Sequence, residues 1–274
     1  MIYSDKALSQ KLERTEGRAN ADCVETRARL FPESGAMWIE VGGAYAMYDG
    51  VGSPLTQTFA LGVFEDAGVE QLDEIEEFYR ERGSDVFHEV SPVIDPSHME
   101  LLSERGYRPI ELTAVMYMDL GDRGNGGPER LFQTSEINTR LVDDAEADIW
   151  ADTAAAGWAS EGNEVAGFVR EFGAIAARTS GGHPFLAELD GRPIAAGGFQ
   201  MYDDVCILAG ASTIPEARRQ GAQNALLRAR LQFAVEQGCS FAMMCAQPGS
   251  QSQKNAQKNG FQIAYTRTKW QLTL

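Results

Sequence analysis

Apolar residues recur along the chain at two kinds of spacing, and each kind predicts a different element. A return every three or four residues, as at Leu72, Ile75 and Phe78, indicates an amphipathic helix. Short apolar runs, such as 205–211, indicate buried strands. The predicted helices are 4–30, 72–82, 96–105, one that opens at 143–146, one through 165–175, 222–237 and 250–259. The predicted strands are 38–41, 44–48, 55–64, 85–90, 111–118, 137–142, 185–189, 194–199, 205–211 and 240–246, with further strands after residue 260.

One short segment interrupts this pattern near the middle of the chain. Residues 121–128 contain four glycines and one proline, and proline carries the only apolar side chain among them. Such a composition is typical of a linker. The 274 residues are enough for two domains of ordinary size, each with its own core. The sequence therefore predicts domains at 1–120 and 131–274, joined by a linker at 121–130.

Composition narrows the class of protein. Hydrophobic residues make up 43% of the chain, and no run approaches the roughly 20 apolar residues of a membrane span. The first residues lack the apolar core of a secretory signal. The four cysteines, Cys23, Cys206, Cys239 and Cys245, show no CxxC spacing and are expected to be reduced thiols. These features favour a cytoplasmic protein without membrane segments.

Charge and histidine content exclude further classes. The formal net charge of −16 opposes binding to nucleic acids and to anionic membranes. It suits a cationic substrate such as an amine, although acidity that only keeps the protein soluble explains it equally well. His88, His98 and His183 have no zinc-ligand spacing, so no metal site is expected. No GxSxG elbow is present, and no cysteine is paired with a histidine at a recognisable spacing.

The most informative stretch joins the apolar run 205–211 to the helix that begins near Ala222. Arg218, Arg219 and Gly221 lie between strand and helix. A glycine at the start of a helix lets a ligand approach the backbone, and the unpaired amides of the first turn attract anions. Arginines beside these amides add positive charge suited to phosphate. The stretch therefore predicts a pyrophosphate cradle at a strand-to-helix turn.

The cradle is neither a Walker loop nor a dinucleotide fingerprint, because the glycines and the Lys-Ser/Thr pair that they need are missing. It resembles the acyl-CoA loop of the GCN5-related N-acetyltransferase (GNAT) superfamily, Gln/Arg-x-x-Gly-x-Gly/Ala. Residues 218–223 match this pattern except at Gln223, which stands in place of a small residue. The order of predicted elements over residues 135–274 is also similar to that family. The resemblance implies an α/β fold with a mixed sheet.

The first half of the chain resembles the second. Residues 101–107 and 255–261 both read as the end of a helix, a glycine, an aromatic residue and then a strand, at a spacing of 154 residues. This similarity indicates two tandem GNAT-like domains. At the place of the arginines, however, the first half has 65–70, which contains Glu65, Asp66 and Glu70. A carboxylate about 4 Å from a phosphate charge costs about 4 kcal/mol at an effective dielectric of about 20, so the first copy is expected to be degenerate and not to bind CoA.

The resemblance implies an acetyl-CoA site in the second half. The donor is expected between strands 205–213 and 240–246, with its pantetheine on the backbone of Ala211, Ser212 and Thr213. The diphosphate is expected on the cradle, and Asn255 is expected to contact the CoA arm. The expected cradle residues are Arg218, Arg219, Gln220, Gly221, Ala222, Gln223 and Asn224.

The catalytic residues are harder to place. The family often has a tyrosine and an asparagine on the late helix, where this chain has Ala256 and Gly249. Ser252 lies on the same helix face and is a candidate partner of the CoA sulfur. The general base is not identified. Glu161, Glu188, Asp203 and Asp204 are candidates by location, a water chain is another, and Tyr265 could reach the cleft.

These observations predict an acetyl-CoA-dependent N-acetyltransferase acting on a primary amine of a small molecule or a peptide. The alternative is a catalytically weak protein of the same fold that binds acyl-CoA or acts as a regulatory protein. The missing tyrosine favours this alternative, whereas the cradle is compatible with both. The sequence leaves a homodimer open.

Overall fold

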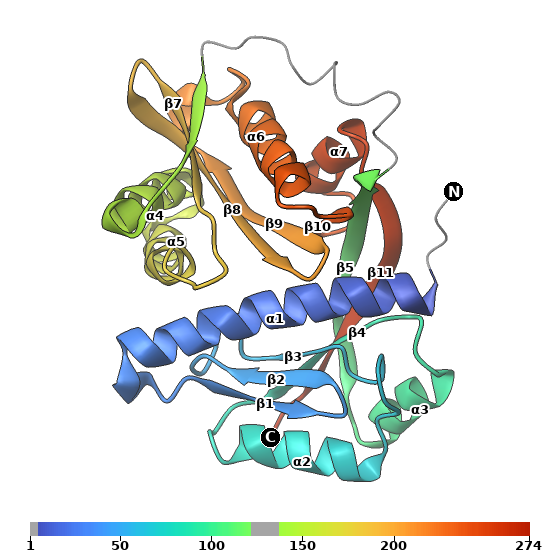
Figure 1. Cartoon of the computed structure of the whole chain (residues 1–274). Coiled ribbons are helices and arrows are strands. Elements are labelled where there is room, and N and C mark those ends of the chain that lie inside the picture. The colour runs from blue at the N-terminus through green and yellow to red at the C-terminus, as the bar shows by residue number, and fades with distance from the viewer. Residues whose placement is uncertain (1–4, 122–136) are drawn as a thin grey trace. The chain divides into compact units, whose positions relative to one another are not determined.

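The computed structural model describes residues 5–121 and 137–274 (Figure 1). Its helices are α1 (Lys6–Leu30), α2 (Val69–Arg80), α3 (Pro96–Glu104), α4 (Ala147–Ala156), α5 (Asn163–Ala176), α6 (Ala222–Glu236) and α7 (Gln251–Lys258). Its strands are β1 (Met37–Val41), β2 (Ala44–Tyr48), β3 (Thr58–Phe59), β4 (Val86–Val90), β5 (Arg108–Asp119), β6 (Asn138–Leu141), β7 (Phe185–Leu189), β8 (Arg192–Tyr202), β9 (Val205–Thr213), β10 (Phe241–Ala246) and β11 (Gln262–Leu272). Short 3-10 helices are η1 (Pro32–Ser34), η4 (Asp144–Glu146), η5 (Ala159–Glu161) and η6 (Pro215–Ala217).

Most predicted elements are present, but two predictions are wrong. The predicted strand 55–64 shrinks to β3, because Ala60 and Gly62 adopt positive φ values of 64° and 71° and the chain turns there. Extended backbone cannot continue through two left-handed residues. The region after residue 260 forms one strand, β11, instead of several; bulges bend it without ending it. The predicted linker 121–130 lies outside the described residues except for Gly121.

The chain divides into two compact units that do not follow the two halves of the sequence. Unit 1 contains residues 1–118 and 243–274, and unit 2 contains residues 119–242. The units differ from the predicted domains 1–120 and 131–274 because the C-terminal segment packs with the N-terminal half. The physical reason is that β11 pairs with β4 on one side and β5 on the other, both antiparallel.

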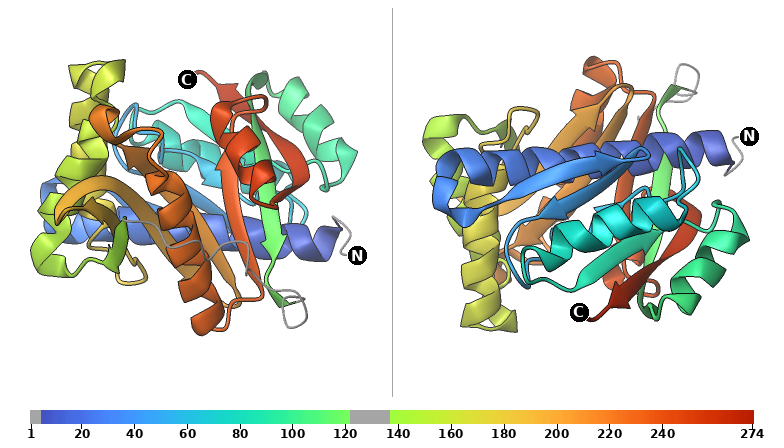
Figure 2. Two further views of the ribbon diagram at one scale, coloured as in Figure 1. Left: turned by 90° about the horizontal axis from the view of Figure 1, so that it is seen from above. Right: turned by 90° about the horizontal axis from the view of Figure 1, so that it is seen from below.

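Unit 1 is built on strands in the order β1-β2-β3-β4-β11-β5. All pairs are antiparallel except β3–β4, which is parallel, so the sheet is mixed and the expected α/β class is confirmed. Helix α1 lies along one face of β1–β3, and α2 and α3 lie on the other (Figures 1 and 2). One core cluster of unit 1 includes Leu72, Ile75, Phe78 and Tyr79 of α2.

Buried charge fastens β11 inside unit 1. Arg267 is 2% exposed, and its guanidinium donates to Glu13 and Glu16 of α1 over 3.2 and 2.8 Å and to Glu89 of β4 over 2.9 Å. The hydroxyl of Tyr265 donates to the other oxygen of Glu13 over 2.8 Å. Burial raises the pKa of Glu13. Because removal of one partner from such a network leaves buried charge uncompensated, the network specifies where the C-terminal strand lies.

The predicted repeat is visible in the two helix ends that lead into β5 and β11. Gly106 after α3 and Gly260 after α7 have φ values of 90° and 94°. In each case the residue after the glycine donates its amide to the carbonyl five residues earlier, over 3.0 and 3.1 Å. Both helices therefore end in the same glycine-dependent cap, at the spacing of 154 residues that the sequence indicates.

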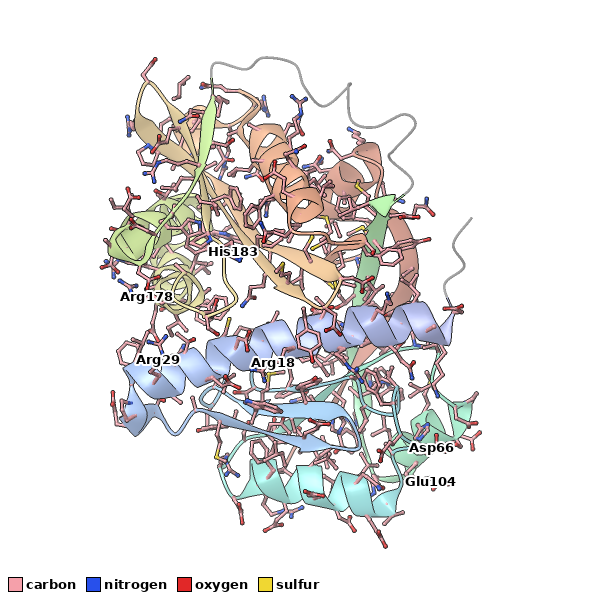
Figure 3. The ribbon with its side chains drawn as sticks, viewed as in Figure 1. Arg18, Arg29, Asp66, Glu104, Arg178 and His183 are labelled. Carbon is pink, nitrogen blue, oxygen red and sulfur yellow. The ribbon has the colours of Figure 1, made fainter. Side chains whose placement is uncertain are left out.

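Unit 2 contains four antiparallel strands in the order β9-β8-β7-β6. Helix α4 packs against one face of β8 and β9, and α6 packs against the other (Figure 2). Phe233 of α6 lies among His183, Phe185 and Phe199, with ring centroids 4.9 to 5.6 Å apart; His183 is labelled in Figure 3. This packing fixes α6 on the sheet, and it fixes the start of α6 beside the end of β9.

No helix in the described ranges 5–121 and 137–274 is both long enough and apolar enough to cross a membrane.

Candidate functional site

The first part of the site is an irregularity near the end of β9. Between two consecutive pairs with β8, β9 has one residue more than its partner, which forms a bulge. Gly210 lies in the bulge with a φ of 63°, and residues 209–211 are exposed. Of the predicted pantetheine contacts, Ala211 lies in this exposed bulge, while Ser212 and Thr213 are buried. The bulge therefore presents backbone to solvent in the middle of a packed unit.

The second part is the loop between β9 and α6. Arg219 has a φ of 66° and Gly221 a φ of 95°, so two of three residues are left-handed. A left-handed conformation costs a non-glycine residue about 1–3 kcal/mol and is retained where the surrounding structure enforces it. A Cβ built on Gly221 would meet no atom within 4 Å. The backbone of this loop is therefore strained at Arg219, and no atom of the described chain fills the space beside Gly221.

The amides of this loop face outward without partners. Across the described residues, the first backbone bond of α6 runs from the amide of Ala225 to Gly221 O over 3.0 Å, and the amides of residues 219–224 have no acceptor. Gly221 is the N-cap of α6 and offers no side chain to cap it. Unpaired amides at a helix start, with the helix dipole behind them, form an anion site.

Arg218 holds the loop in place instead of facing outward. Its Nη2 donates to Gly157 O over 2.9 Å and to Ser160 Oγ over 3.2 Å. Gly157, at the end of α4, lies against β9 so closely that a Cβ there would be 2.5 Å from Ser212 Oγ. Ser212 Oγ in turn donates to Ala154 O over 2.9 Å. The end of α4 and the end of β9 are thus joined, and Arg218 ties the cradle to that junction.

Gln223, the departure from the family pattern, also has a structural partner. Its Nε2 donates to Thr213 Oγ1 over 2.7 Å, so the side chain turns back to β9. The amide of Gln223 remains available, as does that of Asn224, whose side chain is exposed. The larger side chain of Gln223 therefore does not block the backbone amide that the family pattern would use at this position.

The remaining predicted cradle residues differ in exposure. Arg219 is exposed and makes no ion pair within the described chain, so its charge is available at the loop. Gln220 is exposed and its Nε2 donates to Glu216 O over 3.2 Å. Ala222 is 2% exposed and anchors the first turn in the core. The first turn of α6 contains no acidic residue, which leaves the helix dipole uncompensated.

The predicted catalytic residues lie on α7, in unit 1. Ser252 and Asn255 are exposed, and Asn255 Oδ1 accepts from Gln251 Nε2 over 2.8 Å. Ala256, where the family often has a tyrosine, is 2% exposed and belongs to the interior of unit 1. The structure thus places Ser252 on the accessible side of α7, and its role stays a prediction.

The four candidate bases have different surroundings. The carboxylate of Glu188 forms an ion pair with Arg140 over 2.9 Å, so it already has a structural partner. Glu161 is exposed at the end of η5, and Asp203 is exposed in the turn before β9. The backbone oxygen of Asp204 accepts the amides of residues 240 and 241 over 2.7 and 3.1 Å. Tyr265, the further candidate, is buried against Glu13. Over the described ranges, no group of three or more His, Cys, Asp or Glu could hold a metal ion.

The start of α2 is the counterpart of the cradle in the N-terminal half, and the two amides that precede the helix have acceptors. The amide of Ala67 donates to His98 Nε2 over 2.9 Å, and that of Gly68 donates to Gln71 Oε1 over 3.0 Å. Glu65 and Asp66 are exposed beside them; Asp66 is labelled in Figure 3. Two amides at this helix start are therefore used by the protein itself, and exposed carboxylates lie beside them.

Two features of the site escaped sequence reasoning. The bulge at Gly210 carries a signal, because a glycine inside an apolar strand often marks a bulge. The contact of Arg218 with Gly157 carries none, since 61 residues separate them and nothing local relates the two.

Comparisons with known proteins agree with this geometry. Residues 129–261 match the model of the family described as Acetyltransferase (GNAT) family. A GCN5-related N-acetyltransferase from Kribbella flavida shares 20% identity and a TM-score of 0.60, over 92% of this chain and 94% of that one. A GCN5-related N-acetyltransferase from Sphaerobacter thermophilus shares 16% identity and a TM-score of 0.55, over 84% and 76%. A tandem GNAT protein from the clavulanic acid biosynthesis pathway shares 12% identity and a TM-score of 0.57, over 74% and 68%. No curated protein matches the chain. At these identities the similarity to solved structures establishes the fold.

Proposed function

We propose that this chain transfers an acetyl group from acetyl-CoA to a primary amine of a small molecule or a peptide. The match of residues 129–261 to the model of the Acetyltransferase (GNAT) family supports this proposal. The observation that carries the proposal is the loop before α6. Its amides at residues 219–224 lack acceptors in the described chain, and Arg219 is held in a strained conformation beside them. Both properties are expected of a backbone that is shaped for a diphosphate.

Each part of the site has a task in this reaction. The cradle and the Arg219 guanidinium would hold the diphosphate of CoA, and the exposed backbone of the β9 bulge would orient the pantetheine and the thioester carbonyl. The thioester supplies an activated acetyl group, which the neutral amine accepts once its ammonium has lost a proton. Hydrogen-bond donors at the carbonyl oxygen and at the leaving sulfur lower the barrier by stabilising the charge that develops there.

Ser252 is the proposed donor at the sulfur, because the resemblance to the family assigns that role to this helix and Ser252 is an exposed hydroxyl on it. A hydroxyl group can donate a hydrogen bond to a sulfur that becomes negatively charged as it leaves.

The second candidate function is acyl-CoA binding with weak catalysis. The position at which the family often has a tyrosine is Ala256, which is buried and has no polar group. A chain that binds the donor without a strong leaving-group donor would act as an acyl-CoA sensor or regulator.

The test has two stages. Titration of the full chain with acetyl-CoA by calorimetry should give one site per chain, and a thiol-release assay with a panel of small and peptide amines should then show turnover. Absence of acetyl-CoA binding would overturn the whole proposal. Binding without thiol release from any amine would overturn the transferase and support the second candidate.

Ser252→Ala separates binding from catalysis. It should lower kcat about tenfold or more while leaving acetyl-CoA affinity unchanged, as expected when a transition-state hydrogen bond is lost. Lys254→Ala, an exposed neighbour on the same helix, is the matched control and should change neither quantity. An unchanged kcat in Ser252→Ala would remove the serine from the mechanism.

A further inference from the structure

The bulge of β9 lies opposite a part of β8 that carries no side chains. Gly197 alone faces two residues of β9, Gly210 and Ala211, and Gly198 follows it in β8. A glycine has no side chain to pack and weakens the strand that contains it. The groups that lie on the two faces of the sheet therefore decide the shape of this bulge.

On the face that α6 covers, the support is a buried arginine. Arg230 of α6 is 2% exposed. Its Nη1 donates to Gly198 O over 2.9 Å, and its Nε donates to Leu226 O over 3.2 Å. A Cβ built on Gly197 would be 3.0 Å from the guanidinium carbon and 3.1 Å from Nη1. The guanidinium therefore occupies the space of the side chain that Gly197 lacks.

On the face that α4 covers, the support is an indole ring. Trp150 of α4 is 4% exposed, and its Nε1 donates to Phe185 O of β7 over 3.1 Å, which fixes the ring. A Cβ on Gly210 would be 3.8 Å from the ring, and one on Gly198 would be 4.0 Å from it. The bulge is therefore held between a ring on one face and a guanidinium on the other.

The arginine is a costly choice for this place. It makes no ion pair within residues 5–121 and 137–274, and its two hydrogen bonds go to backbone carbonyls. An apolar side chain of similar volume is often more stable than a buried charge. A guanidinium offers one thing more, a donor for Gly198 O where the bulge interrupts the pairing of β8 with β9. Arg230 is therefore better explained by the shape of the bulge than by a gain in stability.

We propose that Arg230 is a positioning residue for the acyl donor, which holds the bulge in the shape that receives the pantetheine arm. This inference rests on the proposed function and divides its donor site into two parts. The amides of residues 219–224 bind the nucleotide part of CoA, whereas the exposed backbone of residues 209–211 binds the arm. Arg230 supports only the second part, so its loss affects the ligands that carry the arm.

The test is a calorimetric titration of the full chain with two ligands. One is acetyl-CoA, and the other is 3′-phospho-ADP, the nucleotide part of CoA without the arm. Arg230→Met should weaken acetyl-CoA binding about tenfold and leave the affinity for 3′-phospho-ADP within about twofold of the parent. The second result also shows that the variant is folded. Arg230→Lys keeps a charged donor and should recover most of the acetyl-CoA affinity.

A second variant disturbs the same contact without removing the charge. In Gly197→Ala the new methyl group displaces the guanidinium from Gly198 O, so acetyl-CoA should again bind more weakly while 3′-phospho-ADP binds as in the parent. Gly167→Ala is the matched control, because a Cβ at this position of α5 would meet no atom within 4 Å. It should bind both ligands as the parent does.

The outcomes separate this inference from the proposed function. Unchanged acetyl-CoA affinity in Arg230→Met, or an equal loss for both ligands, would overturn the role of Arg230 and leave the proposed function standing. Equal affinity of the parent for both ligands would mean that the arm adds nothing, which would also overturn the inference. A parent chain that binds neither ligand would overturn the proposed function and this inference with it.

Discussion

The starts of α6 and α2 occupy corresponding places in the two halves of the chain and have opposite properties. At α6 the amides of residues 219–224 have no acceptor in the described chain, and a Cβ on Gly221 would meet nothing within 4 Å. At α2 the amide of Ala67 donates to His98 and that of Gly68 donates to Gln71. The same order of elements therefore yields an open anion site in one half and, in the other, a helix start whose two preceding amides are used by the protein itself.

Charge sharpens the difference. Arg219 is exposed at the start of α6, whereas Glu65 and Asp66 are exposed at the start of α2. At about 4 Å and an effective dielectric of about 20, each such charge changes the energy of a bound phosphate by about 4 kcal/mol. The comparison teaches that the fold supplies the helix start, and that a few side chains decide whether a ligand or the protein itself uses its amides.

The largest expected effect comes from a carboxylate placed at each helix start. Gly221→Glu should lower acetyl-CoA affinity about a thousand-fold, since about 4 kcal/mol of repulsion corresponds to roughly three powers of ten. Its left-handed φ of 95° adds strain in any residue other than glycine. Calorimetric titration measures the affinity.

Gly68→Glu is the matched control for this change. Because Glu65 and Asp66 already oppose an anion at α2 and the amides of Ala67 and Gly68 have acceptors, acetyl-CoA affinity and the stoichiometry of one per chain should stay as in the parent. Equal losses in both variants would show that the two helix starts do not differ in function.

The next effect concerns the histidine that accepts the amide of Ala67 before α2. His98→Ala leaves the buried amide of Ala67 without an acceptor, which should cost about 1–3 kcal/mol of unfolding free energy. Urea unfolding measures this loss. Acetyl-CoA should still bind at one site per chain, because Glu65 and Asp66 remain beside the opened amides. A second site in the alanine variant would mean that hydrogen bonding alone, without charge, keeps the N-terminal half inactive.

A second histidine shows that unit 1 uses its polar groups for packing. His88 is fully buried beside Tyr107, and burial lowers its pKa from 6.5 to about 3. A lowered folded pKa means that the unfolded chain binds more protons between these values, so the stability that His88 contributes is present above pH 6.5 and is lost as pH falls. Between pH 7 and pH 5 the loss should be about 2 kcal/mol.

Urea midpoints at the two pH values measure this loss. His88→Gln, which does not titrate, should show a smaller decrease by that amount. The same pH dependence in both proteins would place the acid-sensitive group elsewhere.

The features predictable from the sequence are those with local causes. The strand before the cradle, the glycine at the start of α6 and the periodic helices follow from residue type and spacing over a few positions. The prediction of a strand at 55–64 was wrong because its apolar residues suit an extended chain. Ala60 instead adopts a left-handed conformation, which no sequence rule assigns to alanine. The contact of Arg218 with Gly157 could not be predicted for another reason, because only the tertiary fold brings the two residues together.

The smallest effect comes from two glutamines that occupy the first turns of the two helices. Gln71 Oε1 accepts the amide of Gly68 and closes α2, whereas Gln223 Nε2 donates to Thr213 Oγ1 over 2.7 Å and leaves its own backbone amide open. Loss of the second bond removes one tie between α6 and β9, which is worth about 1 kcal/mol. Gln223→Ala should therefore weaken acetyl-CoA binding about fivefold, measured by calorimetry at one temperature. Gln71→Ala, the matched change at α2, should lower stability by a similar amount and leave the affinity as it is. A Gln223→Ala protein that binds as tightly as the parent would show that the cradle keeps its shape without this bond, through Arg218 alone.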